Sequence, residues 1–190
     1  MPINYFTKIT NIDLGGGIVL ADARPSMPRN RLHGAPYKAR DKPPVWEFHH
    51  HSGADGKPGL LGARNSATYD VLNRGFPGAA YTFWIPSADD ENLVYQLNDV
   101  DTISWHTGGL ANRRGIGVCW QGNLDHKPPT EFQCVAAAAL RTFIDAHWPI
   151  TKVSTHALSK PFGGTGKAAC PGPFVTEWLK DHCPKFAERP

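Results

Sequence analysis

The segment VWEFHHHSGADG covers residues 45–56. It begins with a strand pattern, continues with three consecutive histidines and ends in a turn. Residues 45–50 carry side chains typical of a strand, and the Ser, Gly and Asp residues after them are typical of a turn. Neighbouring side chains of a strand point to opposite faces, so Phe48 and His50 are expected on one face and His49 on the other. Active groups often lie where a strand ends in a loop, so this is a candidate site, although only part of the triplet can share a metal ion.

Strand and helix patterns alternate along the rest of the chain. We expect strands over residues 80–85, 93–97, 115–120 and 152–155, and helices over residues 63–74, 130–147 and 173–183. The first two of these strands flank a polar turn and are expected to form a hairpin. The helix over 130–147 is the clearest, because Thr130 and Gln133 fit a capping box and Pro149 ends the pattern. The mixture predicts an α/β fold, a single domain with a central mixed β-sheet flanked by helices.

The first 44 residues differ from the rest of the chain. Three glycines at 15–17 and a stretch rich in Arg and Pro at 25–44 carry no periodic pattern. We therefore expect an irregular N-terminal extension or arm over residues 1–44 and one folded domain over residues 45–190. Whether the arm covers the sheet, contacts a ligand or mediates association stays open.

The composition places the chain among globular proteins. Of its 190 residues, 41% are hydrophobic and 19% are charged, and the net charge of +3 is too weak to indicate nucleic acid. No apolar run approaches the ~20 residues that span a bilayer, and the first residues do not resemble a secretory signal. We expect synthesis in the cytoplasm, no membrane insertion and a monomer. The four cysteines are then expected as reduced thiols.

A second cluster of candidate metal ligands lies towards the end of the chain, at His156 and at Cys170, which begins the sequence Cys-Pro-Gly. Imidazoles and a thiolate are good zinc ligands, and three protein ligands with one open position are typical of a catalytic zinc site. Spacing alone leaves two interpretations open for Cys170, a metal ligand or a free thiol before a turn.

Four further motifs stand between these two clusters, namely AYTFWI (80–85), VYQL (94–97), SWHTGG (104–109) and IGVCWQGN (116–123). With His-His-Ser before them and Cys-Pro-Gly after them, the set resembles the type 2 N-acetylmuramoyl-L-alanine amidases. That family includes phage amidase lysozymes and animal peptidoglycan recognition proteins. The resemblance covers about residues 45–179 and implies a peptidoglycan-recognition-protein-like fold. It makes residues 45–190 an amidase catalytic domain, a zinc hydrolase that cleaves the amide bond between N-acetylmuramic acid and L-alanine in bacterial peptidoglycan.

The resemblance also implies which residues hold the metal. The family's first zinc histidine matches His50, with His49 as the fallback, and the other two ligands match His156 and Cys170. Bound zinc lowers the pKa of a water molecule from ~15.7 toward neutrality, which generates a nucleophile for the amide carbonyl.

Roles in catalysis and substrate binding follow from the same resemblance. Tyr81 matches the active-site tyrosine and is expected to share the developing negative charge of the carbonyl oxygen with zinc. Lys167 is expected to stabilise that charge or to protonate the leaving amine. His106 is expected on the cleft wall as a substrate contact. Trp105 is a second candidate substrate contact, and two interpretations stay open for it, packing in the fold or stacking on a sugar. The general base stays open, with Tyr81 as one candidate.

Three departures from the family pattern bear on these roles. The family usually has Lys or Thr two residues before the cysteine, where this chain has Ala168, and Lys167 lies one residue further away. The loop before Cys170 also contains an inserted Gly-Gly-Thr-Gly at 163–166. The recycling amidases of the family use a glutamate at the position of Cys119, whereas the phage lysozymes, like this chain, have a cysteine there.

These features favour a phage-type endolysin, a bacteriolytic and antimicrobial enzyme that acts on the cell wall after holin-type or other release. Its partner would be peptidoglycan, as polymer or muropeptide. Two alternatives stay open, a cytoplasmic amidase that recycles anhydro-muropeptides and a non-catalytic peptidoglycan-binding module.

Overall fold

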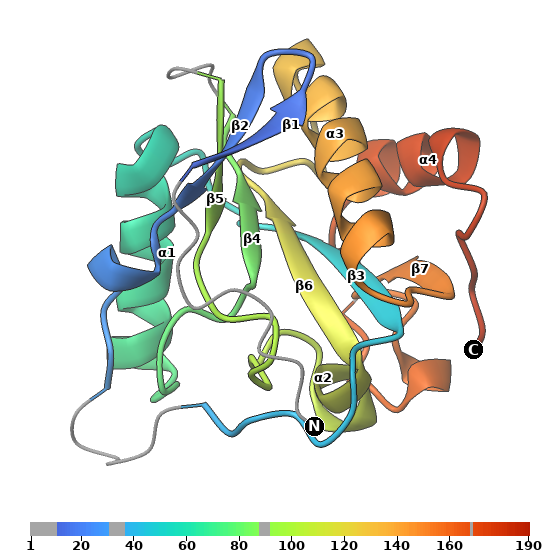
Figure 1. The fold of residues 1–190 in the computed structure, drawn as a ribbon, viewed down its shortest axis with the longest axis horizontal. Coiled ribbons are helices and arrows are strands. Elements are labelled where there is room, and N and C mark those ends of the chain that lie inside the picture. Colours follow the sequence, from blue (N-terminus) through green and yellow to red (C-terminus); the bar gives the residue numbers. More distant parts are fainter. Residues whose placement is uncertain (1–10, 31–36, 88–91, 168) are drawn as a thin grey trace.

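A seven-stranded mixed β-sheet runs through the middle of the molecule (Figure 1). The computed structural model describes residues 11–30, 37–87, 92–167 and 169–190. The strands are β1 (Ile12–Gly15), β2 (Ile18–Asp22), β3 (Trp46–His51), β4 (Phe83–Ile85), β5 (Leu93–Gln96), β6 (Gly115–Trp120) and β7 (Lys152–Thr155). The helices are α1 (Gly59–Asn73), α2 (Gly109–Arg114), α3 (Glu131–His147) and α4 (Pro173–His182). Short 3-10 turns occur at Arg24–Ser26 and Lys160–Phe162.

The order of strands across the sheet is β1-β2-β5-β4-β6-β3-β7. The pairs β1–β2 and β4–β5 are antiparallel, whereas β2–β5, β4–β6, β6–β3 and β3–β7 are parallel. The predicted mixed sheet and the predicted hairpin between β4 and β5 are therefore confirmed. β4 is shorter than expected and begins at Phe83, which leaves Tyr81 just ahead of the strand.

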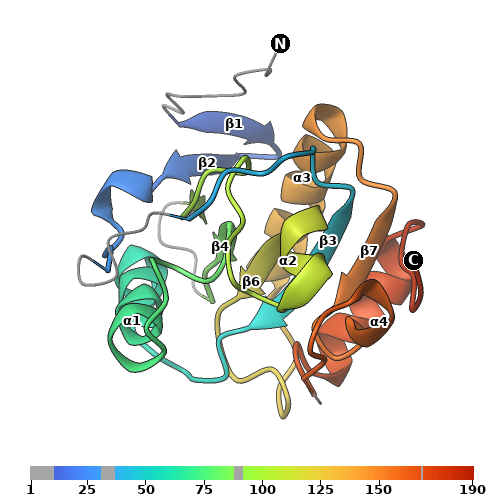
Figure 2. The ribbon, with the colours of Figure 1, turned by 90° about the horizontal axis from the view of Figure 1, so that it is seen from below.

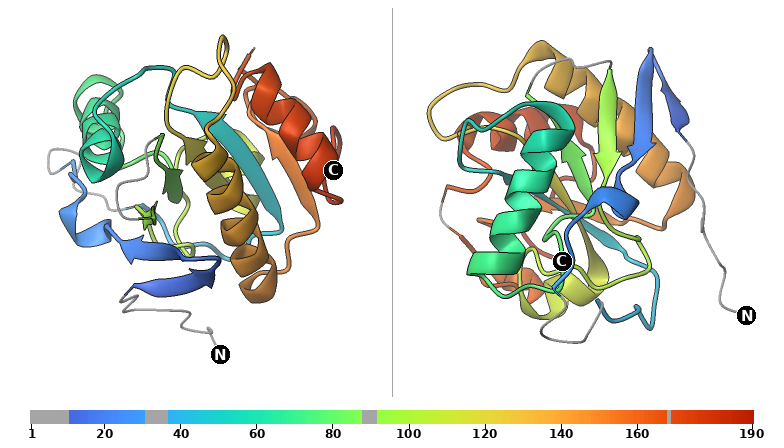
Figure 3. Two further views of the ribbon diagram at one scale, coloured as in Figure 1. Left: turned by 90° about the horizontal axis from the view of Figure 1, so that it is seen from above. Right: turned by 90° about the vertical axis from the view of Figure 1, so that its left-hand side faces the viewer.

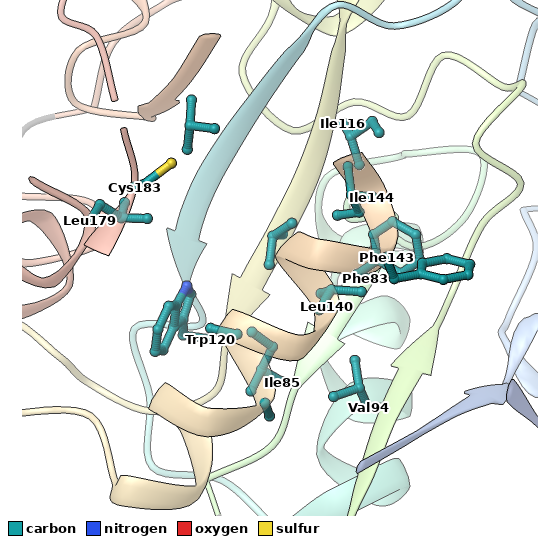
Figure 4. Packing of buried hydrophobic residues seen from close by; sticks show 14 of the residues in the cluster. Phe83, Ile85, Val94, Ile116, Trp120, Leu140, Phe143, Ile144, Leu179 and Cys183 are labelled. Carbon is teal, nitrogen blue, oxygen red and sulfur yellow. The ribbon is translucent and has the colours of Figure 1, made fainter. Parts of the chain in front are cut away.

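Helices cover both faces of the sheet, α3 and α4 on one side and α1 and α2 on the other. Phe83 and Ile85 of β4 pack in the cluster that contains α3 and α4, whereas Trp84 between them packs with α1. Phe48 of β3 packs with Ala111 of α2. Figure 4 shows the packing on the α3 side, and Figure 2 shows α2 in front of β3 and β6. The alternation of strand side chains therefore decides which residues can meet on the α1 and α2 side.

Helix α3 forms where the sequence predicts it and for the predicted reason. The Thr130 hydroxyl accepts from the backbone N–H of Gln133 at 3.2 Å, and the Gln133 side chain accepts from the backbone N–H of Thr130 at 3.1 Å. This capping box satisfies donors that the helix itself leaves unpaired. None of the described helices is both long and apolar enough to cross a bilayer.

The expectation that residues 1–44 are irregular is wrong for residues 12–22, which form the hairpin of β1 and β2 and extend the sheet. Buried Leu20 pairs with Val94 of β5, and the three glycines at 15–17 form the tight turn, with φ of +61° at Gly16. Figure 3 shows this hairpin (blue) at the opposite edge of the sheet from β7 (orange). Residues 1–10 and 31–36 lie outside the described residues, and the domain boundary at residue 44 stays a prediction.

Arg40 ties the N-terminal segment to the end of α2. Its Nη1 donates to the carbonyl oxygens of Asn112 and Arg113, each at 2.7 Å, and its Nη2 donates to Gly115 O at 2.6 Å. Its Nε donates to Val100 O at 2.7 Å. Burial lowers the pKa of Arg40 to about 10, so the guanidinium is still charged at neutral pH. A cation there satisfies carbonyls that the helix leaves free and complements the helix dipole.

Replacing Arg40 by methionine is expected to lower the free energy of unfolding by about 3 kcal/mol, because four carbonyl oxygens, three of them part-buried, lose a charged donor at once. Urea unfolding followed by circular dichroism measures this loss. Arg64→Met is the matched control, since Arg64 is exposed on α1, and it should change stability by less than about 0.5 kcal/mol. Equal stability of the two variants would show that the Arg40 contacts contribute nothing.

Candidate functional site

Two histidines lie side by side where the parallel strands β3 and β7 end. The register pairs His49 with Thr155, so the next residues of the two strands, His50 and His156, become neighbours. The backbone N–H of His156 continues the ladder by donating to His49 O at 3.1 Å. The two imidazole ring centroids are 4.9 Å apart. Carboxyl ends of parallel strands are common places for ligand sites in α/β folds.

Cys170 joins the two histidines from the loop that precedes α4. Its Sγ lies 3.9 Å from His50 Nδ1, and one ligand atom from each of the three residues lies within 4.8 Å of the others. Gly172 makes this approach possible, since its φ is +96° and a Cβ there would collide with the carbonyl oxygen of Leu124. The Cys-Pro-Gly sequence thus turns the chain sharply and delivers the thiol to the two imidazoles.

His49 points away from this group. Its Nε2 lies 2.7 Å from Glu47 Oε1, and its Nδ1 accepts from Trp120 Nε1 at 2.8 Å, on the α3 side of the sheet. The strand alternation expected from the sequence is confirmed at this point. His50, and not the fallback His49, stands with His156 and Cys170.

The protonation states of the two imidazoles suit a metal ion, whereas the Cys170 thiol would have to release its proton on binding one. Burial lowers the pKa of His50 well below its ordinary value and lowers the pKa of His156 to about 4, where Lys167 adds to the effect. Both imidazoles are therefore neutral and keep a lone pair for a metal. Burial raises the pKa of the Cys170 thiol to about 11. Two imidazole nitrogens and one sulfur form a donor set that zinc prefers.

A cavity of about 450 Å³ opens at this cluster and is lined by His156 and Cys170. Tyr81 lines it, with its ring centroid 5.1 Å from that of His50. Burial raises the pKa of the Tyr81 phenol well above its ordinary value, so the phenol keeps its proton and can donate a hydrogen bond. Lys167 also lines this cavity, and its role in catalysis stays a prediction. Ala168, the other position considered for that role, lies outside the described residues.

Trp105 separates this cavity from a second hollow of about 1080 Å³, which Trp105 and Asn112 also line. Its ring lies between Tyr37 and Phe76, with centroid distances of 6.2 and 5.4 Å, and 45% of the residue is exposed. Trp105 thus lines both hollows, and its contact with a substrate stays a prediction.

His106 lines the cavity but is buried, and both its ring nitrogens have partners inside the protein. Nδ1 lies 3.1 Å from His50 Nε2, and Nε2 lies 3.4 Å from Gly115 O. A bond from either nitrogen to a substrate would have to replace one of these contacts. Its role as a substrate contact stays a prediction.

The cavity is also lined by residues that the sequence does not predict, among them Arg74, Asn112 and Thr165. Arg74 is held by Asp70, at 3.1 Å, and lies over the Phe76 ring. In the sequence, Thr165 is distinguished only by its place in the inserted Gly-Gly-Thr-Gly, which does not predict a contact with the site. Asn112 lies on α2, which is too short for a periodic pattern.

Solved structures with a similar fold are peptidoglycan recognition proteins. The complex of tracheal cytotoxin with the PGRP-LCa and PGRP-LCx ectodomains aligns with a TM-score of 0.73 at 18% identity, over 90% of this chain and 99% of that one. Drosophila PGRP-LB aligns with a TM-score of 0.71 at 18% identity, over 89% and 96%. Human PGRP-IβC with glycosamyl muramyl pentapeptide gives 0.69 at 14%, over 90% and 99%. The peptidoglycan-recognition-protein-like fold expected from the sequence is confirmed.

Sequence comparison leads to the same group of proteins. Peptidoglycan recognition protein 1 of Bos taurus, like that of Bos indicus, is 32% identical over 78 residues, which are 41% of this chain and 40% of the relative. The chain thus matches about two fifths of the length of these curated relatives. The model of the N-acetylmuramoyl-L-alanine amidase family matches residues 40–173, a stretch that contains the cluster of His50, His156 and Cys170 and the cavity beside it. This chain therefore belongs to the N-acetylmuramoyl-L-alanine amidase family.

Proposed function

We propose that the protein is a zinc-dependent amidase that cleaves the bond between N-acetylmuramic acid and L-alanine in peptidoglycan. The observation that carries this proposal is the convergence of His50, His156 and Cys170 beside an open cavity. Three protein ligands with an accessible fourth position are the arrangement of a catalytic zinc site, whereas structural zinc sites are closed by four ligands.

Each residue of the site has a distinct task in this reaction. A zinc ion at the three ligands would supply Lewis acidity and lower the pKa of a water molecule toward neutrality. The Tyr81 phenol, kept protonated by its surroundings, donates a hydrogen bond to the carbonyl oxygen as that oxygen gains negative charge. The Lys167 ammonium lines the same cavity and stabilises the same charge, or delivers a proton to the leaving amine.

The neighbourhood of His50 favours a lytic amidase over a recycling amidase that depends on a glutamate. Cys119 is the register partner of His50 on β6, and burial raises the pKa of its thiol well above the ordinary value. A protonated thiol there is a poor general base. Among the described residues that line the cavity there is no Asp or Glu, while Arg74 and Lys167 are both present. We therefore favour a phage-type endolysin that acts on the cell wall after release.

Peptidoglycan as the ligand is supported by two observations. Solved structures with this fold include complexes with tracheal cytotoxin and with a muramyl pentapeptide. The cations that line the cavity complement the carboxylates of the stem peptide.

Removal of zinc should abolish amidase activity, and added zinc should restore it. Purified protein is dialysed against a chelator and incubated with isolated cell walls, and the released peptides are identified by mass spectrometry. We expect stem peptides with a free N-terminal alanine from the zinc-loaded protein and none after chelation. Addition of Mg²⁺ is the control and should not restore release, because the donor set contains sulfur and nitrogen. Full activity in the metal-free protein would overturn the mechanism.

The same assay distinguishes the proposed lytic amidase from two alternatives, a recycling amidase and a non-catalytic binding module. A recycling amidase would prefer soluble anhydro-muropeptides to intact walls, so the rates on the two substrates are compared directly. A binding module would sediment with cell walls but release no peptide even when loaded with zinc.

A further inference from the structure

The nitrogen of His50 that points away from Cys170 is held by a chain of hydrogen bonds. His106 Nε2 lies 3.4 Å from Gly115 O, and a carbonyl oxygen can only accept, so Nε2 carries the proton of this neutral ring. His106 Nδ1 is then an acceptor, and His50 Nε2, 3.1 Å away, must be the donor. This leaves the lone pair of His50 on Nδ1, the atom that faces Cys170 Sγ.

His156 is held by an equivalent chain through a different residue. Its Nε2 lies 3.2 Å from the Thr165 hydroxyl, and that hydroxyl donates its only proton to Thr107 O at 2.9 Å. The hydroxyl oxygen therefore accepts from His156 Nε2–H, and the lone pair of His156 is also on Nδ1. The two chains fix the same tautomer in both rings.

Both chains meet in the loop over residues 104–108, where His106 and Thr107 are consecutive. The side-chain oxygen of Asn112 holds this loop by accepting from the backbone N–H groups of His106, Thr107 and Gly108 at 3.1, 2.8 and 2.9 Å. One residue of α2 thus fixes the loop on which both chains depend.

The inserted glycine loop over residues 163–166 packs directly on that loop. The backbone N–H of Thr165 donates to Thr107 O at 2.7 Å, and Leu110 N–H donates to Gly163 O at 3.1 Å. A Cβ at Gly108 would come within 2.7 Å of Thr165 Cγ2, so glycine is needed for the two loops to come this close. The insertion therefore has a structural consequence, since it carries the hydroxyl that holds His156.

We propose that Thr165 and His106 are positioning residues that fix His156 and His50 as Nδ1 donors before a metal ion arrives. This inference rests on the proposed zinc site. A free imidazole samples both tautomers and rotates about its side-chain bonds, whereas a ring with its other nitrogen bonded presents one lone pair in one direction. Loss of such an outer partner typically weakens metal binding by about 10- to 100-fold.

The test compares Thr165→Val with Thr165→Ser. Thr165 is exposed, so neither change threatens the fold, and valine keeps the methyl group that packs on Gly108 while removing the hydroxyl. We expect the zinc Kd, measured by competition with a chromophoric chelator, to rise about 10- to 100-fold in Thr165→Val. Thr165→Ser should retain nearly wild-type affinity. The visible absorption of the Co²⁺-loaded protein should change in Thr165→Val alone, because it reports the geometry of the ligands.

A second pair of variants, at His106, tests in the same way whether the partner of His50 supports zinc binding. His106→Asn places an acceptor oxygen near the position of Nδ1 and should bind zinc more tightly than His106→Leu, which has no acceptor. Should His106→Leu fail to fold, the Thr165 pair alone decides. Equal zinc Kd values and Co²⁺ spectra for Thr165→Val and Thr165→Ser would overturn the inference. A wild-type protein that does not retain zinc would instead overturn the proposed function, and the two failures are therefore distinguishable.

Discussion

Replacement of Cys170 by serine is expected to remove bound zinc and amidase activity together. Cys170 is only 3% exposed and supplies the only sulfur of the three-residue group. A serine hydroxyl is a much poorer zinc ligand than a thiolate, and two imidazoles alone leave the site with too few strong donors. Losing a metal ion worth several kcal/mol of transition-state stabilisation predicts a rate loss of at least about 10³-fold.

Metal content and product release should be measured on the same preparation, by elemental analysis and mass spectrometry. Cys134→Ser is the matched control, because Cys134 is a free, partly buried cysteine on α3, away from the cavity. It should keep both zinc and activity. A Cys170→Ser protein that cleaves cell walls at the wild-type rate without zinc would contradict the proposed function.

Tyr81→Phe should have the opposite pattern, with zinc retained and the rate lost. The change removes one hydroxyl and leaves the ring that packs beside His50. Loss of one donor to a developing oxyanion typically lowers kcat by about 10²–10³-fold. Because the phenol bonds more strongly to the transition state than to the ground state, we expect kcat to fall while KM changes little.

Tyr69→Phe is the control for this variant, since Tyr69 is 54% exposed on α1. It should match the wild type in zinc content and in kcat. If Tyr81→Phe lost its zinc as well, Tyr81 would act by supporting the metal site and not as a donor to the substrate. An unchanged kcat would remove Tyr81 from the mechanism.

The parts of the site that could be predicted from the sequence depend on regular structure. The period of two along β3 separates His50 from His49, and the parallel end of β7 brings His156 to the same place. Helix α3 carries its own signal in the capping box at Thr130. The order of short motifs along the chain then connects Cys170 to these histidines, which spacing alone could not do.

The parts that could not be predicted depend on contacts between loops. Thr165 meets His156 only because two glycine-containing loops pack against each other, and no period in the sequence encodes such a contact. Helix α2 has six residues, fewer than two turns, which is too short for a periodic pattern. The sequence therefore predicts neither this helix nor the role of Asn112 on it. The hairpin of β1 and β2 could not be predicted, because three consecutive glycines carry no strand pattern although they form its turn.

The hairpin of β1 and β2 also decides where the chain can be shortened or joined to another domain. β2 covers the outer edge of β5, so a version cut at residue 45 would leave a row of unpaired backbone groups on β5. Bare strand edges recruit other chains and promote aggregation. A shortened version of the protein should therefore keep β1 and β2, and a domain fused at the N-terminal side should be joined upstream of β1.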